Sequence, residues 1–509
     1  MCFYFMFNKP INNLMIRSLS IIILFVAAIF NVSAQQTKIE YNNTVRQALN
    51  ALLKDENMQH ATVGFVAKDM KTNEIIAEHN ANISMATAST LKLISTATAL
   101  EVFGPDFRFV TTIEYEGKID KNKRILNGNI YIHGGGDPCL GSKKFESNYY
   151  SPHFMDSWVT AIKSAGIDSI NGAIIGDDML YSGEFVPTTW SWEDIGNYYG
   201  AGVSGLSIYD NAYTVEMQSG SQTTKILTID PVLPELIFFN EVDAKSITKD
   251  NSIIYGGPYS NFRRMRGSIP KNKSHFFVRG AIHDPAYVCA YHLEKKLNEN
   301  MIFATKTLTT TKDMYFNDEL KYGTRVSIYQ TYSPSLRDIV YRTNMWSMNL
   351  YAEHMINHIG LRRKNIGSSY QGILALKEFW TEKGMDTKGF MIYDGSGLSQ
   401  YNAVTAEHFY FILKYMKYNS KYFTDFYNSM PIAGQTGTLA SMCKGTYAQG
   451  NLHAKSGSIK NTRSYAGYVT TKSGREVAFS IMLNHFNCDD STARKLLEKL
   501  MVAIADCNQ

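Results

Sequence analysis

The sequence predicts an α+β fold, and three observations on its periodicity and composition support this prediction. Up to Phe107, helical and strand patterns alternate along the chain. After Phe107 the pattern is mostly that of strands, and helical periodicity returns at Ser335. The 509 residues, 44% hydrophobic and 19% charged, have the composition of an ordinary globular protein and suffice for two or three domains with a large core.

The first 34 residues have the pattern of a signal peptide. Lys9 and Arg17 are the only charges in these 34 residues, and the mostly apolar stretch 19–30 leads to a small-residue cleavage site that ends at Ala34. The apolar stretch is short for a membrane span, and no cysteine stands at the cleavage point. We therefore expect an exported, periplasmic protein that is soluble or peripherally attached to the membrane.

The elements that follow are predicted from periodicity and from turn residues. Helices are expected at residues 44–54, 88–100, 154–165, 284–297, 335–359, 371–383 and 491–505. Strands are expected at residues 61–68, 74–79, 109–115, 125–133, through most of 213–311, and at 465–469 and 477–483.

The first chemical pattern is Ser89-x-x-Lys92 at the start of an apolar helix. Residues three apart lie on one face of a helix. A lysine in a dry site can be neutral near pH 7 and can take the proton of the serine hydroxyl. The helix N-terminus adds free N–H groups, which suit a developing oxyanion. The same spacing recurs without such a helix at Ser246/Lys249, Ser268/Lys271 and Ser441/Lys444.

Two further patterns follow in order. Ser347-x-Asn349 lies in the predicted helix 335–359, which also carries His354 and His358 at a spacing that can bind a metal. A third metal ligand is not evident, so we predict no metal site.

The last pattern, Lys455-Ser456-Gly457-Ser458, begins a strand near the C-terminus. There a cation, a hydroxyl and a glycine that permits close backbone approach can face a substrate carboxylate. A second Lys-Ser-Gly at Lys472 lies between two apolar strands and is typical of a hairpin turn.

Other classes of function are disfavoured. The formal charge of +5 is mild, so we expect no nucleic-acid partner. The five cysteines beyond the signal segment form no Cys-x-x-Cys pair, which indicates neither a disulfide framework nor a zinc site, although one bridge is possible. The nucleophile elbow Gly-x-Ser-x-Gly of the α/β hydrolases does not occur.

Taken together and in this order, the three patterns resemble those of the penicillin-binding proteins. The resemblance is closest to the class C low-molecular-mass D-alanyl-D-alanine carboxypeptidase/endopeptidase family, and it covers nearly all of the chain after the signal segment. Ser456 stands where the family usually has threonine, and Met348 stands where aspartate is common. Further resembling stretches are 104–109, 134–138, 394–399 and 431–439.

The resemblance implies a transpeptidase/β-lactamase-like domain, an antiparallel five-stranded sheet with helices on both faces. It implies that this domain is discontinuous, formed by residues 35–115 and 335–509. A mostly β inserted region, 116–334, would interrupt it, with a nested smaller segment near 140–214.

The resemblance also implies the chemistry. Ser89 would attack a D-Ala-D-Ala type peptide bond with Lys92 as general base, and Ser347, held between Lys92 and Lys455, would pass a proton to the leaving amine. Backbone N–H groups of Ser89 and Ser458 would form the oxyanion hole. No metal or organic cofactor is implied. The residues that would bind the substrate are Asn349, Lys455, Ser456, Gly457 and Ser458.

The substrates implied are peptidoglycan stem peptides, with β-lactam antibiotics as covalent inhibitors; the oligomeric state is left open. We expect a hydrolase that trims or cuts peptidoglycan, because no membrane anchor is expected after processing and no synthetic module precedes the Ser89 helix. Two alternatives stay open: a β-lactamase, and a non-catalytic penicillin-binding or wall-binding protein.

Overall fold

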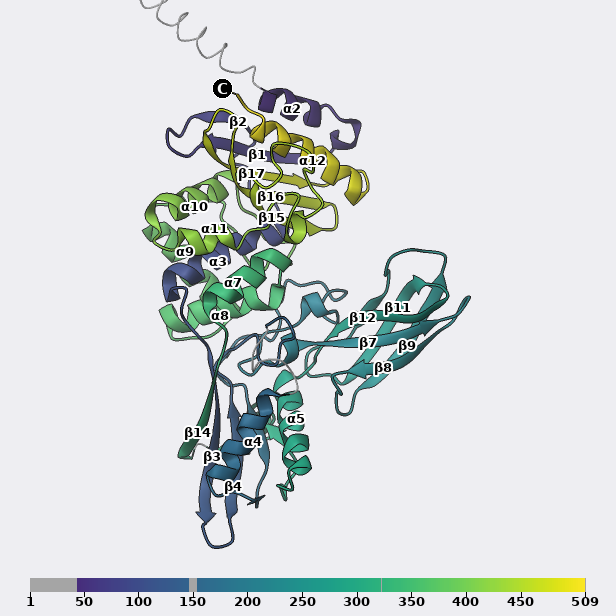
Figure 1. Ribbon diagram of the computed structural model, residues 1–509, viewed down its shortest axis with the longest axis vertical. Coiled ribbons are helices and arrows are strands. Elements are labelled where there is room, and N and C mark those ends of the chain that lie inside the picture. Colours follow the sequence, from purple (N-terminus) through teal and green to yellow (C-terminus); the bar gives the residue numbers. More distant parts are fainter. Residues whose placement is uncertain (1–43, 146–152, 322, 509) are drawn as a thin grey trace, which may run out of the picture.

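The computed structural model describes residues 44–145, 153–321 and 323–508, so the predicted signal peptide lies outside the described residues. The molecule is elongated (Figure 1), with a helical and sheet body at one end and two extensions, built mostly of strands, at the other. Within the described ranges, no helix is both long and apolar enough to span a membrane.

An antiparallel sheet with the strand order β15-β16-β17-β1-β2 forms the first half of the body. Side chains of β1 and β17 alternate between two hydrophobic cores: Phe65 and Phe479 face one, and Val66 and Met482 face the other. The predicted sheet with helices on both faces is therefore confirmed. Its strands are β1 (Thr62–Asp69), β2 (Ile75–His79), β15 (His453–Ile459), β16 (Thr462–Thr470) and β17 (Glu476–Asn484).

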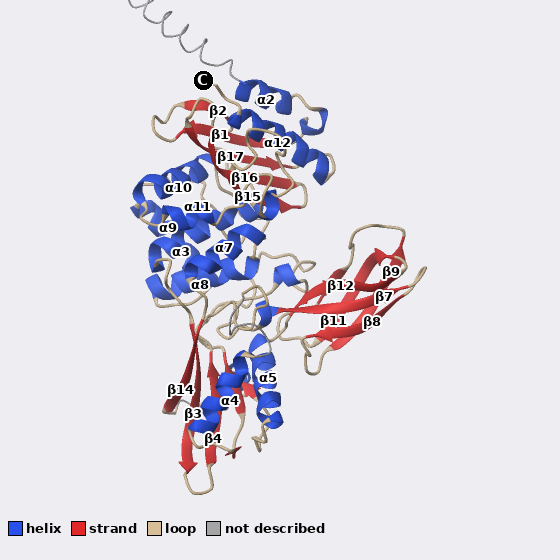
Figure 2. Ribbon diagram, in the orientation of Figure 1, coloured by secondary structure: helices blue, strands red, loops and turns tan. Residues whose placement is uncertain are grey.

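Helices from distant parts of the chain cover the two faces of this sheet (Figure 2). One face is covered by α2 (Thr44–Leu53) and α12 (Asp490–Ala505). The other is covered by a larger helical layer, whose most buried member is α3 (Lys92–Phe103). The rest of that layer is α7 (Leu336–Trp346), α8 (Asn349–Lys364), α9 (Ser369–Glu382), α10 (Ala406–Asn419) and α11 (Phe423–Asn428).

The inserted region leaves and rejoins the body through two neighbouring strands. β3 (Val110–Asp120) follows the α3 end of the body, and β14 (Arg325–Tyr332), which precedes α7, pairs with it in antiparallel register. A mixed sheet grows from this pair in the order β13-β6-β4-β3-β14, with β5 beside β4. Its other elements are β4 (Ile125–His133), β5 (Ser169–Ile170), β6 (Ile174–Asp177), β13 (Thr309–Thr310), α4 (Phe154–Ser164), α5 (Pro285–Glu299) and α6 (Thr311–Phe316).

Two further sheets, each three-stranded within the described chain, form the second extension (Figure 1). Their orders are β12-β7-β8 and β10-β11-β9, and we call residues 212–281, which form them, the nested sheets. Residues 140–214, where we predict a nested segment, contain α4, the strands β5 and β6 of the mixed sheet, and the start of β7. The strands are β7 (Ala212–Ser219), β8 (Thr224–Asp230), β9 (Ile237–Lys245), β10 (Ile253–Tyr255), β11 (Phe262–Pro270) and β12 (Lys273–Ala281).

The predicted single helix at 335–359 is wrong in one respect. The structure has two helices there, because Ser347 adopts the left-handed conformation, with φ 59° and ψ 44°, and ends α7. α8 then starts at Asn349. Because of this break, Ser347 lies at the C-terminal end of α7 and Asn349 at the N-terminal end of α8, so neither is in the interior of a helix.

Candidate active site

Ser89 lies in a short 3₁₀ turn, η2 (Ala88–Leu91), that leads directly into α3. With three residues per turn, side chains at i and i+3 eclipse each other, which brings Lys92 beside Ser89. The Nζ atom of Lys92 lies 2.8 Å from Ser89 Oγ and donates a second hydrogen bond of 2.6 Å to the Ser396 carbonyl. Ala88, just before the serine, has a φ of 46°, a strained backbone of the kind that clusters at functional sites.

Burial changes the acidity of Lys92. The residue is fully buried, and loss of hydration lowers the pKa of its ammonium to about 7, even though the nearby carboxylates of Asp394 and Glu353 act in the opposite direction. A large share of Lys92 is therefore neutral near pH 7. In that form its nitrogen can accept the proton of Ser89, so the predicted general base has the acidity that its role needs.

Two buried carboxylates hold the loop that carries the Ser396 carbonyl. Glu353 of α8 accepts hydrogen bonds from the backbone N–H groups of Gly395 (3.0 Å) and Ser396 (2.7 Å). Burial, together with the nearby Asp394, raises the pKa of Glu353. Asp394 accepts hydrogen bonds from Gly397 N, Ser399 N, Asn402 Nδ2 and Trp190 Nε1.

Sequence reasoning assigned no role to Glu353 or Asp394. The only signal was the Asp-Gly-Ser-Gly stretch that begins at Asp394. In the structure both carboxylates support the position of Lys92 without reaching the cleft, since neither is exposed to solvent.

Ser347 and Lys455 are brought together from distant parts of the chain. Lys455 Nζ donates hydrogen bonds to Ser347 Oγ (3.0 Å) and to the Ser456 carbonyl (2.6 Å). Burial, together with the nearby ammonium of Lys92, lowers the pKa of Lys455 well below its ordinary value. Lys455 is fully buried, and the side chain to which it donates a hydrogen bond in the site is that of Ser347.

Asn349 lies at the first position of α8, and its side-chain amide is held from the inserted region. Asn349 Nδ2 donates a hydrogen bond of 2.7 Å to the carbonyl of Tyr199. Tyr199 belongs to a short turn, η3 (Tyr198–Gly200), that lies between the mixed sheet and the nested sheets in the chain. The inserted region thus takes part in fixing the predicted substrate-binding amide.

Strand β15 forms the opposite wall of the cleft. The hydroxyl of Ser456 donates a hydrogen bond of 2.7 Å to Thr438, a threonine whose partnership the sequence did not indicate. Ser458 lines the same cleft as Ser89. Gly457 lies so close to η2 that a Cβ atom added there would be 2.8 Å from Ser89 N and 2.6 Å from the Thr87 carbonyl.

We therefore expect Gly457→Ala to damage the site. The added methyl group meets backbone atoms of η2, which cannot rotate away as a side chain would, so η2 and β15 must separate. Overpacking of this kind costs about 1–3 kcal/mol of stability, measurable by urea unfolding, and should slow acylation of Ser89. Gly220→Ala is a control for the loss of a glycine, because Gly220 is exposed, its φ is not in the left-handed region, and the nearest atom to its added Cβ is 3.7 Å away; normal acylation in Gly457→Ala would contradict the close approach.

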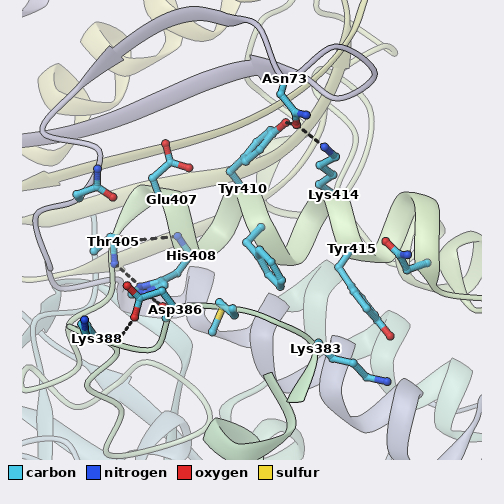
Figure 3. Close-up of a pocket in the computed structure, with 14 residues that line it drawn as sticks. Asn73, Lys383, Asp386, Lys388, Thr405, Glu407, His408, Tyr410, Lys414 and Tyr415 are labelled. Atoms are coloured by element: carbon cyan, nitrogen blue, oxygen red, sulfur yellow. Dashed lines mark hydrogen bonds between the residues drawn. The ribbon is translucent and has the colours of Figure 1, made fainter. Parts of the chain in front are cut away.

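The cleft around Ser89 has a volume of about 440 Å³. Its walls come from the body and from the inserted region, and the residues that line it include Ser89, Ser347, Asn349, Ser458, Lys144, Glu193, Tyr198, Asp210 and Arg279. A larger cavity of about 750 Å³ lies elsewhere, beside α10 (Figure 3). None of the predicted site residues lines that cavity, and several of its polar groups already pair with each other, as Lys414 does with Asn73.

The residues that repeat the three patterns lie apart from the cleft. Ser268 is on β11, and the Lys472 copy forms the turn between β16 and β17, as predicted. His354 is buried and bonded to the Gly136 carbonyl (2.9 Å) and to Ser207 (3.1 Å), while the ring of His358 packs among the aromatic rings of 103, 107 and 109. Among the residues with described positions, no group of three His, Cys, Asp or Glu side chains could hold a metal ion, and Cys139, Cys289, Cys443 and Cys488 are free thiols.

Comparisons with known proteins agree with this geometry. The model of the D-Ala-D-Ala carboxypeptidase 3 (S13) family matches residues 45–506. A D-alanyl-D-alanine carboxypeptidase of Actinomadura sp. (strain R39) is 25% identical over 456 residues, which cover 86% of this chain and 81% of that protein. The D-alanyl-D-alanine carboxypeptidase DacB of Haemophilus influenzae is 25% identical over 446 residues, which cover 84% of this chain and 87% of that protein.

The fold has a counterpart among solved structures. Penicillin binding protein 4 from Haemophilus influenzae superposes with a TM-score of 0.73 at 22% identity, covering 89% of this chain and 97% of that one. The predicted fold class and family are both confirmed. The chain belongs to the D-Ala-D-Ala carboxypeptidase 3 (S13) family, and it is a serine peptidase, that is, a hydrolase.

Proposed function

We propose that Ser89 is the nucleophile of this hydrolase and that Lys92 is its general base. The observation that carries the proposal is the 2.8 Å contact between Ser89 Oγ and a fully buried Lys92 whose pKa is about 7. Ser89 Oγ bonds to the carbonyl carbon of the first D-Ala, and its proton passes to Lys92 Nζ.

The tetrahedral intermediate then collapses. Its C–N bond breaks, and the leaving amine takes a proton through the hydroxyl of Ser347, which Lys455 holds by its 3.0 Å hydrogen bond. Water next attacks the acyl-enzyme ester, releases the acid and restores the Ser89 hydroxyl. Release of terminal D-Ala and cleavage of D-Ala-linked cross-bridges differ only in the amine that leaves.

The remaining residues of the cleft bind the substrate. The N–H groups of Ser89 and Ser458 form the oxyanion hole, a contribution of about 3–4 kcal/mol for a donor of this kind. Asn349 binds the acyl side. Since Lys455 is buried behind Ser347, the hydroxyls of Ser456 and Ser458 make the direct contacts to the substrate carboxylate, and Lys455 and Gly457 support that wall.

Penicillin tests the nucleophile. We expect a slowly hydrolysed acyl adduct, which intact-protein mass spectrometry detects and peptide mapping places on Ser89. The repeated patterns at Ser246, Ser268 and Ser441 are internal controls, because an adduct on any of them would refute the assignment. Fast turnover of penicillin would favour the β-lactamase alternative, and an unmodified protein would favour a non-catalytic binding protein.

The same mass spectrum tests export. We propose that residues 1–34 are a signal peptide, that cleavage follows Ala34, and that the product acts in the periplasm. Protein recovered from the periplasm should then have the mass of residues 35–509, and an intact N-terminus would contradict the proposal. We also propose that residues 35–115 and 335–509 form the catalytic domain, with 116–334 as the inserted region.

A further inference from the structure

The nested sheets reach the catalytic cleft at one end of β12. Ala281 N donates a hydrogen bond of 3.0 Å to the Gly196 carbonyl, and Gly280 forms an isolated β-bridge with Asn197. These contacts tie the end of β12 to the turn η3. The residue that precedes this tie on β12 is Arg279, whose side chain is exposed.

The guanidinium of Arg279 is positioned but not neutralised. Its Cζ atom lies 3.7 Å from the centre of the Tyr198 ring, an ideal stacking distance for a cation on an aromatic face. Within the described parts of the chain it makes no ion pair, whereas Arg264 of the same nested sheets binds Glu241 through two nitrogens. A planar cation held flat by an aromatic ring keeps its hydrogen-bonding edge available.

Arg279 lies where two cavities meet. The cleft of Ser89 and a second cavity of about 200 Å³ share Lys144, Asp210, Ala212 and Arg279 among their lining residues. Lys144 is already paired with Asp210. Arg279 is therefore the cation of this shared wall that has no carboxylate partner among the described residues.

The direction of the substrate follows from η3. The Tyr199 carbonyl binds the amide of Asn349, which we place on the acyl side of the scissile bond, and Tyr198 next to it stacks on Arg279. A stem peptide whose acyl side lies along Asn349 thus extends from Ser89 towards Arg279 and the second cavity. Peptidoglycan stem peptides contain acidic residues, and a carboxylate is the group that a guanidinium fork binds in bidentate geometry.

We propose that Arg279 and the second cavity form a subsite that binds a carboxylate on the acyl side of the stem peptide, upstream of the residue that acylates Ser89. Arg279 is a specificity-determining residue in this arrangement, and Tyr198 orients it. The proposal rests on the proposed function of Ser89 and Asn349.

Two matched synthetic peptides test the subsite. Both end in D-Ala-D-Ala; one carries a free carboxylate upstream on its acyl side, and the other carries the amide at that position. We expect the wild-type protein to hydrolyse the carboxylate peptide with a kcat/KM about tenfold higher, mainly through a lower KM, as one charge-assisted bidentate contact would give. In Arg279→Gln this preference should vanish, and Arg279→Lys, which keeps the charge but not the fork, should retain part of it.

Arg266→Gln is the matched control. It removes an exposed guanidinium from the same nested sheets, outside the residues that line the cleft, and should keep the full preference. A preference that persists in Arg279→Gln, or that Arg266→Gln loses equally, would overturn the subsite. Penicillin separates the two proposals: failure to acylate wild-type Ser89 refutes the proposed function, whereas acylation without a carboxylate preference between the two peptides refutes the subsite alone.

Discussion

Lys92→Met is expected to slow acylation of Ser89 by penicillin about a thousandfold, within the range attributed to a positioned general base. Methionine has nearly the length of lysine and fills the buried space, but its thioether cannot take the serine proton. The rate constant is measured from the growth of the adduct mass with time. Lys444→Met is the matched control, because Lys444 stands in the repeated pattern after Ser441 and is exposed.

The pH dependence of the same reaction gives a second, independent reading of Lys92. Only the neutral amine can act as base, so with a pKa of about 7 the wild-type rate constant should rise about tenfold per pH unit below pH 7 and level off above it. This rise of the rate constant below pH 7 should be missing in Lys92→Met. A variant that keeps the wild-type rate or the wild-type pH limb would show that another group accepts the proton.

Glu353→Ala is expected to lower the free energy of unfolding by about 3 kcal/mol, because the N–H groups of Gly395 and Ser396 then lose their buried acceptor and a cavity remains. Urea unfolding measures this loss. Acylation should slow as well, since the carbonyl that orients Lys92 belongs to Ser396.

Two further variants make this test specific. Glu353→Gln keeps one acceptor oxygen and should lose less stability than Glu353→Ala. Glu378→Ala removes an exposed carboxylate that pairs with Lys364 on the surface, and it should cost no more than about 1 kcal/mol. Equal losses in Glu353→Ala and Glu378→Ala would mean that the buried hydrogen bonds of Glu353 contribute nothing special.

The positions of the three patterns could be predicted from the sequence because each has local cues. The Lys-Ser-Gly pattern at Lys472 lies between two apolar strands, which is typical of a hairpin turn. The Lys-Ser-Gly pattern at Lys455 therefore remained as the candidate for the site. The apolar run after Ser89 likewise marked a buried helix, and α3 is buried over most of its length.

The rest depends on contacts between distant residues, which no local pattern contains. The helix break at Ser347 could not be predicted, because no glycine or proline stands there. A serine adopts the left-handed backbone conformation only when its surroundings hold it in that conformation. In the sequence, Glu353 does not differ from the other polar residues of its helix. Its buried hydrogen bonds are made with the loop at Gly395, more than forty residues later in the chain. The bond from Asn349 to Tyr199 joins two regions that the sequence treats as separate domains.

The pairing of β1 with β17 joins the two ends of the described chain. Thr62 pairs with Asn484, so the strand that precedes the Ser89 helix finds its main neighbour only at the end of the chain. Ribosomes and export channels deliver a chain from its N-terminus, and pairing between such distant segments is slow because a very long loop must close first. We therefore expect the proposed nucleophile Ser89 to stay without its complete sheet until the last strands have been made, so the protein should be inactive during its own synthesis.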